Sequence, residues 1–309
     1  MQSNRYVQAV LASLLTLGPS LAFCQPRSAS ENVAVADLGP NLVVFTTSTG
    51  NVVASVGPDG ALLVGTPSLG STDQISRMLS LRTRSPHRYV VITSEDPGRS
   101  EGDAGWQARG AFVAMQENAL GRFGGHTMGA PMPLPQHLIQ LGVDRPRISF
   151  SEVLSFDLNH EAIHFIHQQG GSDDAQVLVH FHMANLLYFG EDFPGNGYPR
   201  IDVAHGGNLD GILKVVNSWT DPKFQIVPVH GKVMTGSDVD AYCKMLTTVR
   251  DRIQKLVQEG KTEEQILDAR PSSDFDSRWG HGSVSPTDFV QEIYSAIKAN
   301  QSSAHPTHP

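Results

Sequence analysis

Cysteine is nearly absent from this chain of 309 residues, which contains only Cys24 and Cys243. A disulfide framework is therefore excluded, and Cys243, which falls among the apolar positions of a predicted helix, is expected to be a small buried side chain. Charged residues make up only 17% of the chain, and the net charge is -8 with no basic stripe. We therefore expect no nucleic-acid partner. Apolar runs are too short for a membrane span.

The first 24 residues indicate export. A polar, positive start at Arg5 is followed by an apolar run over residues 7–17 and by small residues at positions 22 and 24. Phe23 is bulkier than the residue that lipid attachment at Cys24 needs, so we expect signal-peptide cleavage near Cys24 and a periplasmic or secreted protein rather than a lipoprotein. The expected organisation is a signal peptide over 1–24, a linker over 25–35, one domain over 36–300 and a flexible tail over 301–309.

Hydrophobic residues make up 39% of the chain, enough for a large core. Short apolar runs bounded by turn residues predict strands over 42–45, 52–56, 61–64, 89–93, 111–115, 155–158, 162–166, 177–182, 186–189 and 224–227. Three- and four-residue apolar spacing and capping signals predict helices over 74–81, 105–109 and 238–259, with further helix starts at Thr262 and Ser285. This order of strands, helices, strands and helices favours two facing sheets with helices outside.

Short motifs extend over nearly all of the chain that follows the signal peptide. They are Gly50-Asn51-Val52-Val53, Val56-Gly57-Pro58-Asp59-Gly60, Gln116-Glu117-Asn118, Gly170-Gly171, Gly190 with Gly197-Tyr198-Pro199, Gly206-Gly207 with Asp210-Gly211, Val229-His230-Gly231 and Arg278-Trp279-Gly280. Together they resemble the metallo-β-lactamase superfamily, in particular its periplasmic hydrolases. The resemblance implies an α/β fold, the αββα four-layer sandwich, with the site along the edges of the sheets.

That family holds one or two zinc ions through a His-x-His-x-Asp-His run, a His after a Gly-Gly pair, a bridging Asp after a Gly and a His before a Gly. By the resemblance these positions fall on Ser94, Asp96, Gly98 and Arg99, then on Ser172, on Glu191 with Asp192 beside it, and on His230. Only His230 matches outright. Zinc needs three or four donor side chains, and Arg99 places a positive charge where a ligand would be. We therefore expect no zinc cofactor.

The function that these residues favour is that of a pseudoenzyme that binds a small anionic molecule or a partner protein. Fixed cationic side chains in place of a metal keep the attraction for carboxylates or phosphates. The expected ligand-binding residues are Ser94, Asp96, Arg99, Ser172 and Lys232.

Two alternatives stay open. One is a hydrolase of an ester, thioester or lactam with a single metal ion on His230, Glu191 and Asp192 or Asp96. The other is metal-free chemistry at Ser94, for which the sequence offers no Gly-x-Ser-x-Gly elbow.

His180 and His182 are separated by one residue on a predicted strand, so both imidazoles lie on one face. Such a pair can bind a metal ion, and His164 on the preceding strand is a candidate neighbour. The alternative is that these are ordinary strand histidines, because no third ligand is close in sequence.

Overall fold

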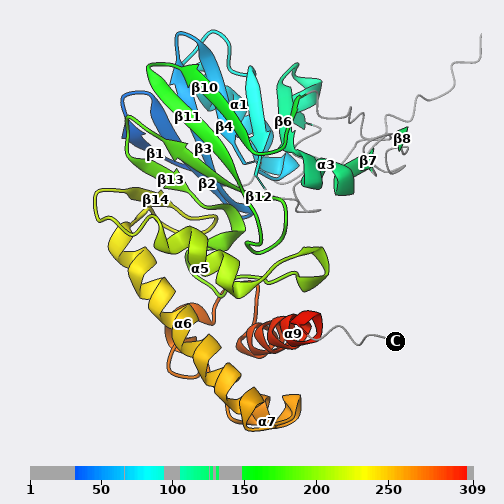
Figure 1. The fold of residues 1–309 in the computed structure, drawn as a ribbon. Helices are drawn as coiled ribbons and strands as arrows, with labels where there is room; N and C mark the ends of the chain where they lie inside the picture. Colours follow the sequence, from blue (N-terminus) through cyan, green and yellow to red (C-terminus); the bar gives the residue numbers. More distant parts are fainter. Residues whose placement is uncertain are drawn as a thin grey trace, which may run out of the picture.

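The computed structural model describes residues 32–65, 67–93, 105–124, 126–127, 130–131 and 148–304. In this part of the chain two sheets face each other, and helices lie outside them (Figure 1). The arrangement confirms the α/β class and the four-layer sandwich that the sequence predicts.

The first sheet has seven strands in the order β1-β2-β3-β4-β5-β6-β9. They are β1 (Ala34–Gly39), β2 (Leu42–Thr47), β3 (Gly50–Gly57), β4 (Gly60–Val64), β5 (Tyr89–Ile92), β6 (Phe112–Gln116) and β9 (Ile148–Phe150). Strands β1 to β4 pair antiparallel, whereas β4, β5, β6 and β9 pair parallel. Parallel pairing requires crossovers, and the first one contains helix α1 (Leu69–Ser80).

The second sheet has six strands in the order β10-β11-β12-β13-β14-β15. They are β10 (Val153–Leu158), β11 (Glu161–Gln168), β12 (Gln176–Phe181), β13 (Leu186–Tyr188), β14 (Gln225–Val227) and β15 (Met234–Thr235). Only the β13–β14 pair is parallel, and helix α5 (Leu209–Asn217) lies in its crossover. A further two-stranded sheet pairs β7 (His126–Thr127) with β8 (Ala130–Pro131).

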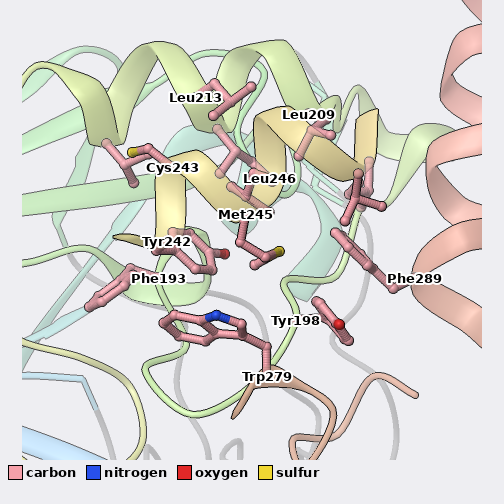
Figure 2. Packing of buried hydrophobic residues seen from close by; sticks show 14 of the residues in the cluster. Phe193, Tyr198, Leu209, Leu213, Tyr242, Cys243, Met245, Leu246, Trp279 and Phe289 are labelled. Carbon is pink, nitrogen blue, oxygen red and sulfur yellow. The ribbon is translucent and has the colours of Figure 1, made fainter. Parts of the chain in front are cut away.

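Three apolar cores separate the four layers. The core between the sheets takes side chains such as Val53 and Leu62 from the first sheet and Phe165 and Val179 from the second. A second core packs the outer face of the first sheet against α1. The third, shown in Figure 2, packs the outer face of the second sheet against α5, α6 (Gly236–Gln258) and α9 (Pro286–Ala304). Burial of these faces supplies the main driving force for folding.

Further helices in the described part of the chain include α3 (Glu117–Gly124), α7 (Glu263–Asp268), α8 (Asp276–Trp279) and the short η2 (Gly190–Asp192) and η3 (Val203–His205). The predicted capping box of Thr262 with Gln265 is present at α7, and the Ser285 hydroxyl accepts from the Asp288 main-chain N–H at α9. Cys243 is buried on α6, as predicted. Among the described residues, no helix has the length and apolar character needed to cross a bilayer.

Candidate functional site

Four segments meet where strands of both sheets end, and we call this region the site edge. They are Thr93 after β5, Gly170–Ser172 between β11 and β12, Gly190–Asp192 after β13 and residues 228–232 after β14. Close contacts join them: a Cβ on Gly190 would lie 3.9 Å from the Thr93 carbonyl oxygen, and the His230 main-chain N–H donates to the Pro194 carbonyl at 3.0 Å. The region that the resemblance implies is therefore assembled.

The carboxyl of Asp192 is directed into the protein. The Ser172 main-chain N–H donates to its Oδ1 at 2.6 Å, and the side chain is fully buried. In the described part of the chain, Oδ2 forms no hydrogen bond of ordinary geometry, and neither does the hydroxyl of the buried Ser172. Burial, with the nearby charges of Asp173 and Glu191, raises the pKa of Asp192 to about 7, against the lowering effect of the Ser172 contacts.

Neighbouring glycines allow this close approach. A Cβ on Gly171 would lie 2.5 Å from Oδ1 of Asp192, closer than any side chain tolerates. Gly190 adopts a φ of 60°, which places Glu191 so that its main-chain N–H donates to Oε1 of the buried Gln176 at 3.3 Å. The Gly-Gly pair and Gly190, which the sequence motifs contain, are thus required by backbone packing at the site edge.

Asn51 on β3 holds the His230 segment in place. Its side-chain amide donates to the carbonyls of Pro228 at 2.8 Å and Gly231 at 2.9 Å, and its main-chain N–H donates to the Val229 carbonyl at 2.7 Å. His230 itself is half-buried, and Lys232, one residue beyond Gly231, is exposed to solvent.

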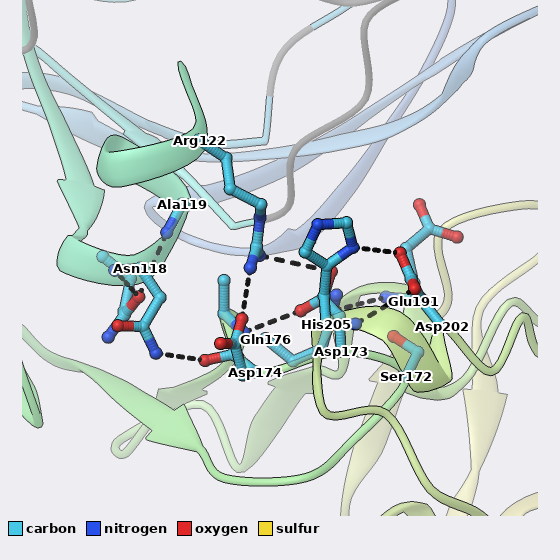
Figure 3. A network of polar contacts seen from close by, with 12 residues as sticks. Asn118, Ala119, Arg122, Ser172, Asp173, Asp174, Gln176, Glu191, Asp202 and His205 are labelled. Carbon is cyan, nitrogen blue, oxygen red and sulfur yellow. Dashed lines mark hydrogen bonds and ion pairs between the residues drawn. The ribbon is translucent and has the colours of Figure 1, made fainter. Parts of the chain in front are cut away.

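Arg122 on α3 faces the acidic residues that follow Ser172 (Figure 3). Its guanidinium donates to Oδ1 of Asp174 and lies 3.6 Å from Oδ2 of Asp173. On the other side of Ser172, the Asp202 carboxylate lies 2.7 Å from Nδ1 of His205. Three aspartates around the site edge therefore have basic partners.

Of the predicted site residues, the structure joins Ser172 to Asp192, and the His230 main chain to Pro194, two residues after Asp192. Glu191 precedes Asp192, and Lys232 follows the His230 segment at an exposed position. Ser94, Asp96 and Arg99 lie outside the described residues. Sequence reasoning missed Asn51 as the residue that fixes the His230 segment, and it missed Arg122. The signal that would have indicated Asn51 is a polar amide directly before the strand over 52–56, because a buried amide needs hydrogen-bond partners.

Comparison with solved structures identifies the fold. The metallo-β-lactamase from Pontibacter korlensis superposes with a TM-score of 0.53 at 14% identity, covering 70% of this chain and 99% of its own. The metallo-β-lactamase from Hirschia baltica gives a TM-score of 0.51 at 14% identity, covering 69% and 97%. This chain has the metallo-β-lactamase fold.

The same fold occurs in a stereoselective inverting sec-alkylsulfatase from Pseudomonas sp., which superposes with a TM-score of 0.62 at 13% identity. That match covers 90% of this chain but only 52% of the alkylsulfatase, so the chain spans about half the length of that enzyme. No protein-family model and no curated protein matches the sequence. Because function depends on the site rather than on the fold, these likenesses establish the architecture alone.

Zinc, which the metallo-β-lactamase fold implies, does not fit the residues at the site edge. Within the described ranges, no group of three or more His, Cys, Asp or Glu side chains is placed to hold a metal ion. Asp192 directs its carboxyl toward the Ser172 main chain, and Ser172 stands where the resemblance places the family's histidine after a Gly-Gly pair. Catalytic zinc sites use three protein ligands around one point.

The histidines of the second sheet form a separate cluster. His164 and His180 pair directly across β11 and β12, so the predicted neighbour relation is confirmed. Ring centroids are 6.4 Å apart for His164 and His180, 6.5 Å for His164 and His182, and 5.5 Å for His180 and His182. The site edge lies before the start of β12 and this cluster at its end, and the six residues of β12 span roughly 17 Å at the usual strand rise.

Proposed function

We propose that this metallo-β-lactamase-fold protein uses the site edge to bind a small anionic molecule, and that it is not a zinc-dependent hydrolase. Two observations support the proposal. The segments of the site edge are fixed to one another through Asn51, Pro194 and the Ser172–Asp192 contact, so the region is pre-organised. The acidic groups there are paired or buried instead of converging as metal ligands.

The distribution of charged side chains at the site edge also supports anion binding. Arg122 lies against Asp173 and Asp174, and His205 lies against Asp202. Burial raises the pKa of Asp192 to about 7, so about half of its negative charge is removed at neutral pH and most of it below neutral pH.

At the site edge the exposed Lys232 supplies a positive charge for an anion, with His230 two residues before it, and we add Arg99 by the sequence resemblance. Lysine and arginine beside backbone donors attract carboxylates and phosphates without any metal. Lys232 is exposed and stands directly after the segment that Asn51 anchors, so its charge is presented at a fixed place.

We further propose that the protein is exported, with its signal peptide removed near Cys24, and that it works in the periplasm or outside the cell. The proposal rests on the charge and apolar pattern of residues 1–24. Mass spectrometry of the protein recovered from its native host tests it: a mature amino terminus at Gln25 is expected, and an intact amino terminus contradicts it.

Binding of anions tests the functional proposal. Isothermal titration calorimetry with inorganic phosphate, citrate and a sugar phosphate is expected to show saturable binding by at least one of them in the presence of a chelator. Lys232→Gln is expected to weaken that binding roughly tenfold, as loss of one charge-assisted contact does. Lys244→Gln, which removes an exposed lysine on α6, is the matched control and is expected to leave it unchanged.

Two outcomes contradict the proposal. One is that none of the three anions binds, or that Lys232→Gln and Lys244→Gln bind alike. The other is turnover of an ester or a lactam that needs added zinc and is lost with a chelator, because that result would establish the hydrolase alternative.

A further inference from the structure

The end of helix α1 and the loop that leads from it to β5 form a basic segment. Residues 74–93 contain Arg77, Arg82, Arg84 and Arg88 but no Asp or Glu, although the whole chain has a net charge of -8. The segment is short, so the chain as a whole shows no basic stripe. Its arginines precede β5, whereas Thr93 of the site edge follows that strand, so the proposed anion site does not use them.

Hydrogen bonds hold this loop against the turn between β3 and β4. The Thr83 hydroxyl donates to the Gly57 carbonyl at 2.8 Å, and the Ala61 main-chain N–H donates to the Ser85 carbonyl at 2.9 Å. At the helix end, the Thr83 main-chain N–H donates to the Leu79 carbonyl at 3.0 Å. The backbone that carries the arginines is therefore fixed to the first sheet.

Leu81 projects into solvent among these arginines. It is the most exposed large apolar side chain in the described part of the chain, with 88% of its surface open. It follows Arg77 by four residues at the end of α1, which places the two side chains on one side of the helix. With Arg82, Arg84 and Pro86 it lines a shallow concavity of about 530 Å³. Apolar and cationic groups thus share one surface.

Acidic side chains beside this surface are already engaged. The Asp37 carboxylate pairs with Arg82 at 2.6 Å, and Oδ2 of Asp59 accepts the Asn159 main-chain N–H at 2.8 Å. Within the described ranges, the other three arginines of the segment form no ion pair. Their positive charges are therefore available to an external anionic surface.

We propose that Leu81, Arg77, Arg84 and Arg88 form a docking surface, which we call the arginine face, for a lipid bilayer that contains anionic phospholipids. Guanidinium groups bind phosphates through paired N–H donors. An exposed leucine between them inserts into the apolar layer beneath the headgroups, which is how basic and apolar residues combine at membrane surfaces.

The exposed leucine favours a bilayer over other anionic partners. A single exposed leucine is ordinary on a protein surface, but Leu81 stands at the centre of the arginines. A free phosphate ion or a soluble polyanion engages the arginines alone, whereas a bilayer also has an apolar layer for Leu81. Three arginines and one leucine give weak and reversible docking, since each basic residue near an anionic surface contributes about fivefold to binding.

Vesicle flotation of the full chain tests this docking. We expect the protein to float with phosphatidylcholine vesicles that contain roughly 30% phosphatidylglycerol and not with pure phosphatidylcholine vesicles. Salt is expected to release it between about 0.1 M and about 0.5 M, because the Debye length shortens. Arg84→Gln is expected to lower the vesicle partition coefficient roughly fivefold, and Leu81→Ser at least about fivefold. Both side chains are exposed, so both variants are expected to fold.

Arg200→Gln and Val153→Ser, which replace an exposed arginine and an exposed valine elsewhere, are the matched controls. Both are expected to partition like the original protein. The proposal is overturned if the protein does not float with the anionic vesicles, or if Arg84→Gln and Leu81→Ser partition like these controls.

Three further results overturn the proposal and identify another partner or place. Flotation that an excess of glycerol phosphate abolishes indicates a site for a free anion. Heparin binding that Leu81→Ser leaves unchanged, without flotation, indicates a soluble polyanion. Flotation that is lost in Lys232→Gln but kept in Arg84→Gln locates the contact at the site edge. Anion binding at the site edge is measured by calorimetry without vesicles, so its failure is independent of these results.

Discussion

The Ser172 main-chain N–H lies 2.6 Å from Oδ1 of the fully buried Asp192. The carboxyl of Asp192 is thereby directed into the protein, where burial raises its pKa to about 7. Asp192 follows Glu191, the residue at which the resemblance places the family's bridging ligand. This contact ties the segment after β13 to the β11–β12 connection. It also makes the stability of the protein depend on pH in a defined direction.

Asp192→Asn is expected to stabilise the protein at pH 8 and to have a clearly smaller stabilising effect at pH 5. The pKa of Asp192 rises from 3.8 to about 7 on folding, so the folded state keeps a proton that the unfolded state releases. Stability from this group is present below pH 4 and is lost as the pH rises to about 7. The shift sets an upper bound of roughly 4 kcal/mol, and water entry reduces it, so we expect about 1–3 kcal/mol.

Urea denaturation of both proteins at pH 5 and pH 8 measures this difference. Asparagine keeps an oxygen that accepts a hydrogen bond from the Ser172 N–H, so the substitution removes the ionisable group and retains this hydrogen bond. A destabilising effect at pH 8 would show that a cation compensates the ionised carboxylate, contrary to our account.

Asn51→Ala is expected to destabilise the protein by about 2 kcal/mol. The substitution leaves the carbonyls of Pro228 and Gly231 without the amide donor that now reaches both of them, and Asn51 is only 2% exposed. Asn217→Ala, at an exposed position on α5, is the control and should change the free energy of unfolding by less than about 0.5 kcal/mol. Equal effects of the two substitutions in urea denaturation would show that Asn51 does not anchor the His230 segment.

Gly195→Ala and Gly231→Ala separate steric overlap from backbone strain at the site edge. Both glycines have left-handed φ values, 92° and 91°. A Cβ on Gly195 would overlap the His230 carbonyl oxygen and lie 2.5 Å from Cβ of Pro228, whereas one on Gly231 meets nothing within 4 Å. We expect Gly231→Ala to cost about 1–2 kcal/mol from strain alone and Gly195→Ala to cost at least about 2 kcal/mol more.

Thermal or urea unfolding of the two glycine variants checks this order. If Gly231→Ala is as destabilising as Gly195→Ala, the close contact between the segment after β13 and His230 is not the important restraint. Weakened anion binding in Gly195→Ala, measured on the fraction that folds, would accompany the predicted order.

Several features of the fold could be predicted from the sequence, because they depend on local patterns. The apolar stripe over 238–259 and the signals at Thr262 and Ser285 gave helices that the structure confirms to within a few residues. Strand β1 was missed, since its largely exposed residues show no apolar alternation. The parallel order of β4, β5, β6 and β9 also could not be predicted, because hairpin signals report only neighbouring antiparallel strands.

The site was predictable in its outline but not in its contacts. His230 and Glu191 follow from motifs of the chain, and the structure brings their segments together. The inward turn of Asp192 depends on packing against Gly171 and Ser172, which are some 20 residues away in sequence, and no local pattern indicates it. The pairing of His164 with His180 depends on strand register, so local patterns indicated only a candidate neighbour.

The zinc content and hydrolytic activity of the purified protein test the central claim most directly, because the claim is that the site edge binds anions without a metal. After incubation with zinc and gel filtration, we predict no stoichiometric zinc and no ester or lactam hydrolysis that a chelator abolishes. Two results together would contradict the claim that the site edge binds anions without a metal. They are one equivalent of zinc that the His230→Gln variant does not bind, and hydrolysis that a chelator abolishes.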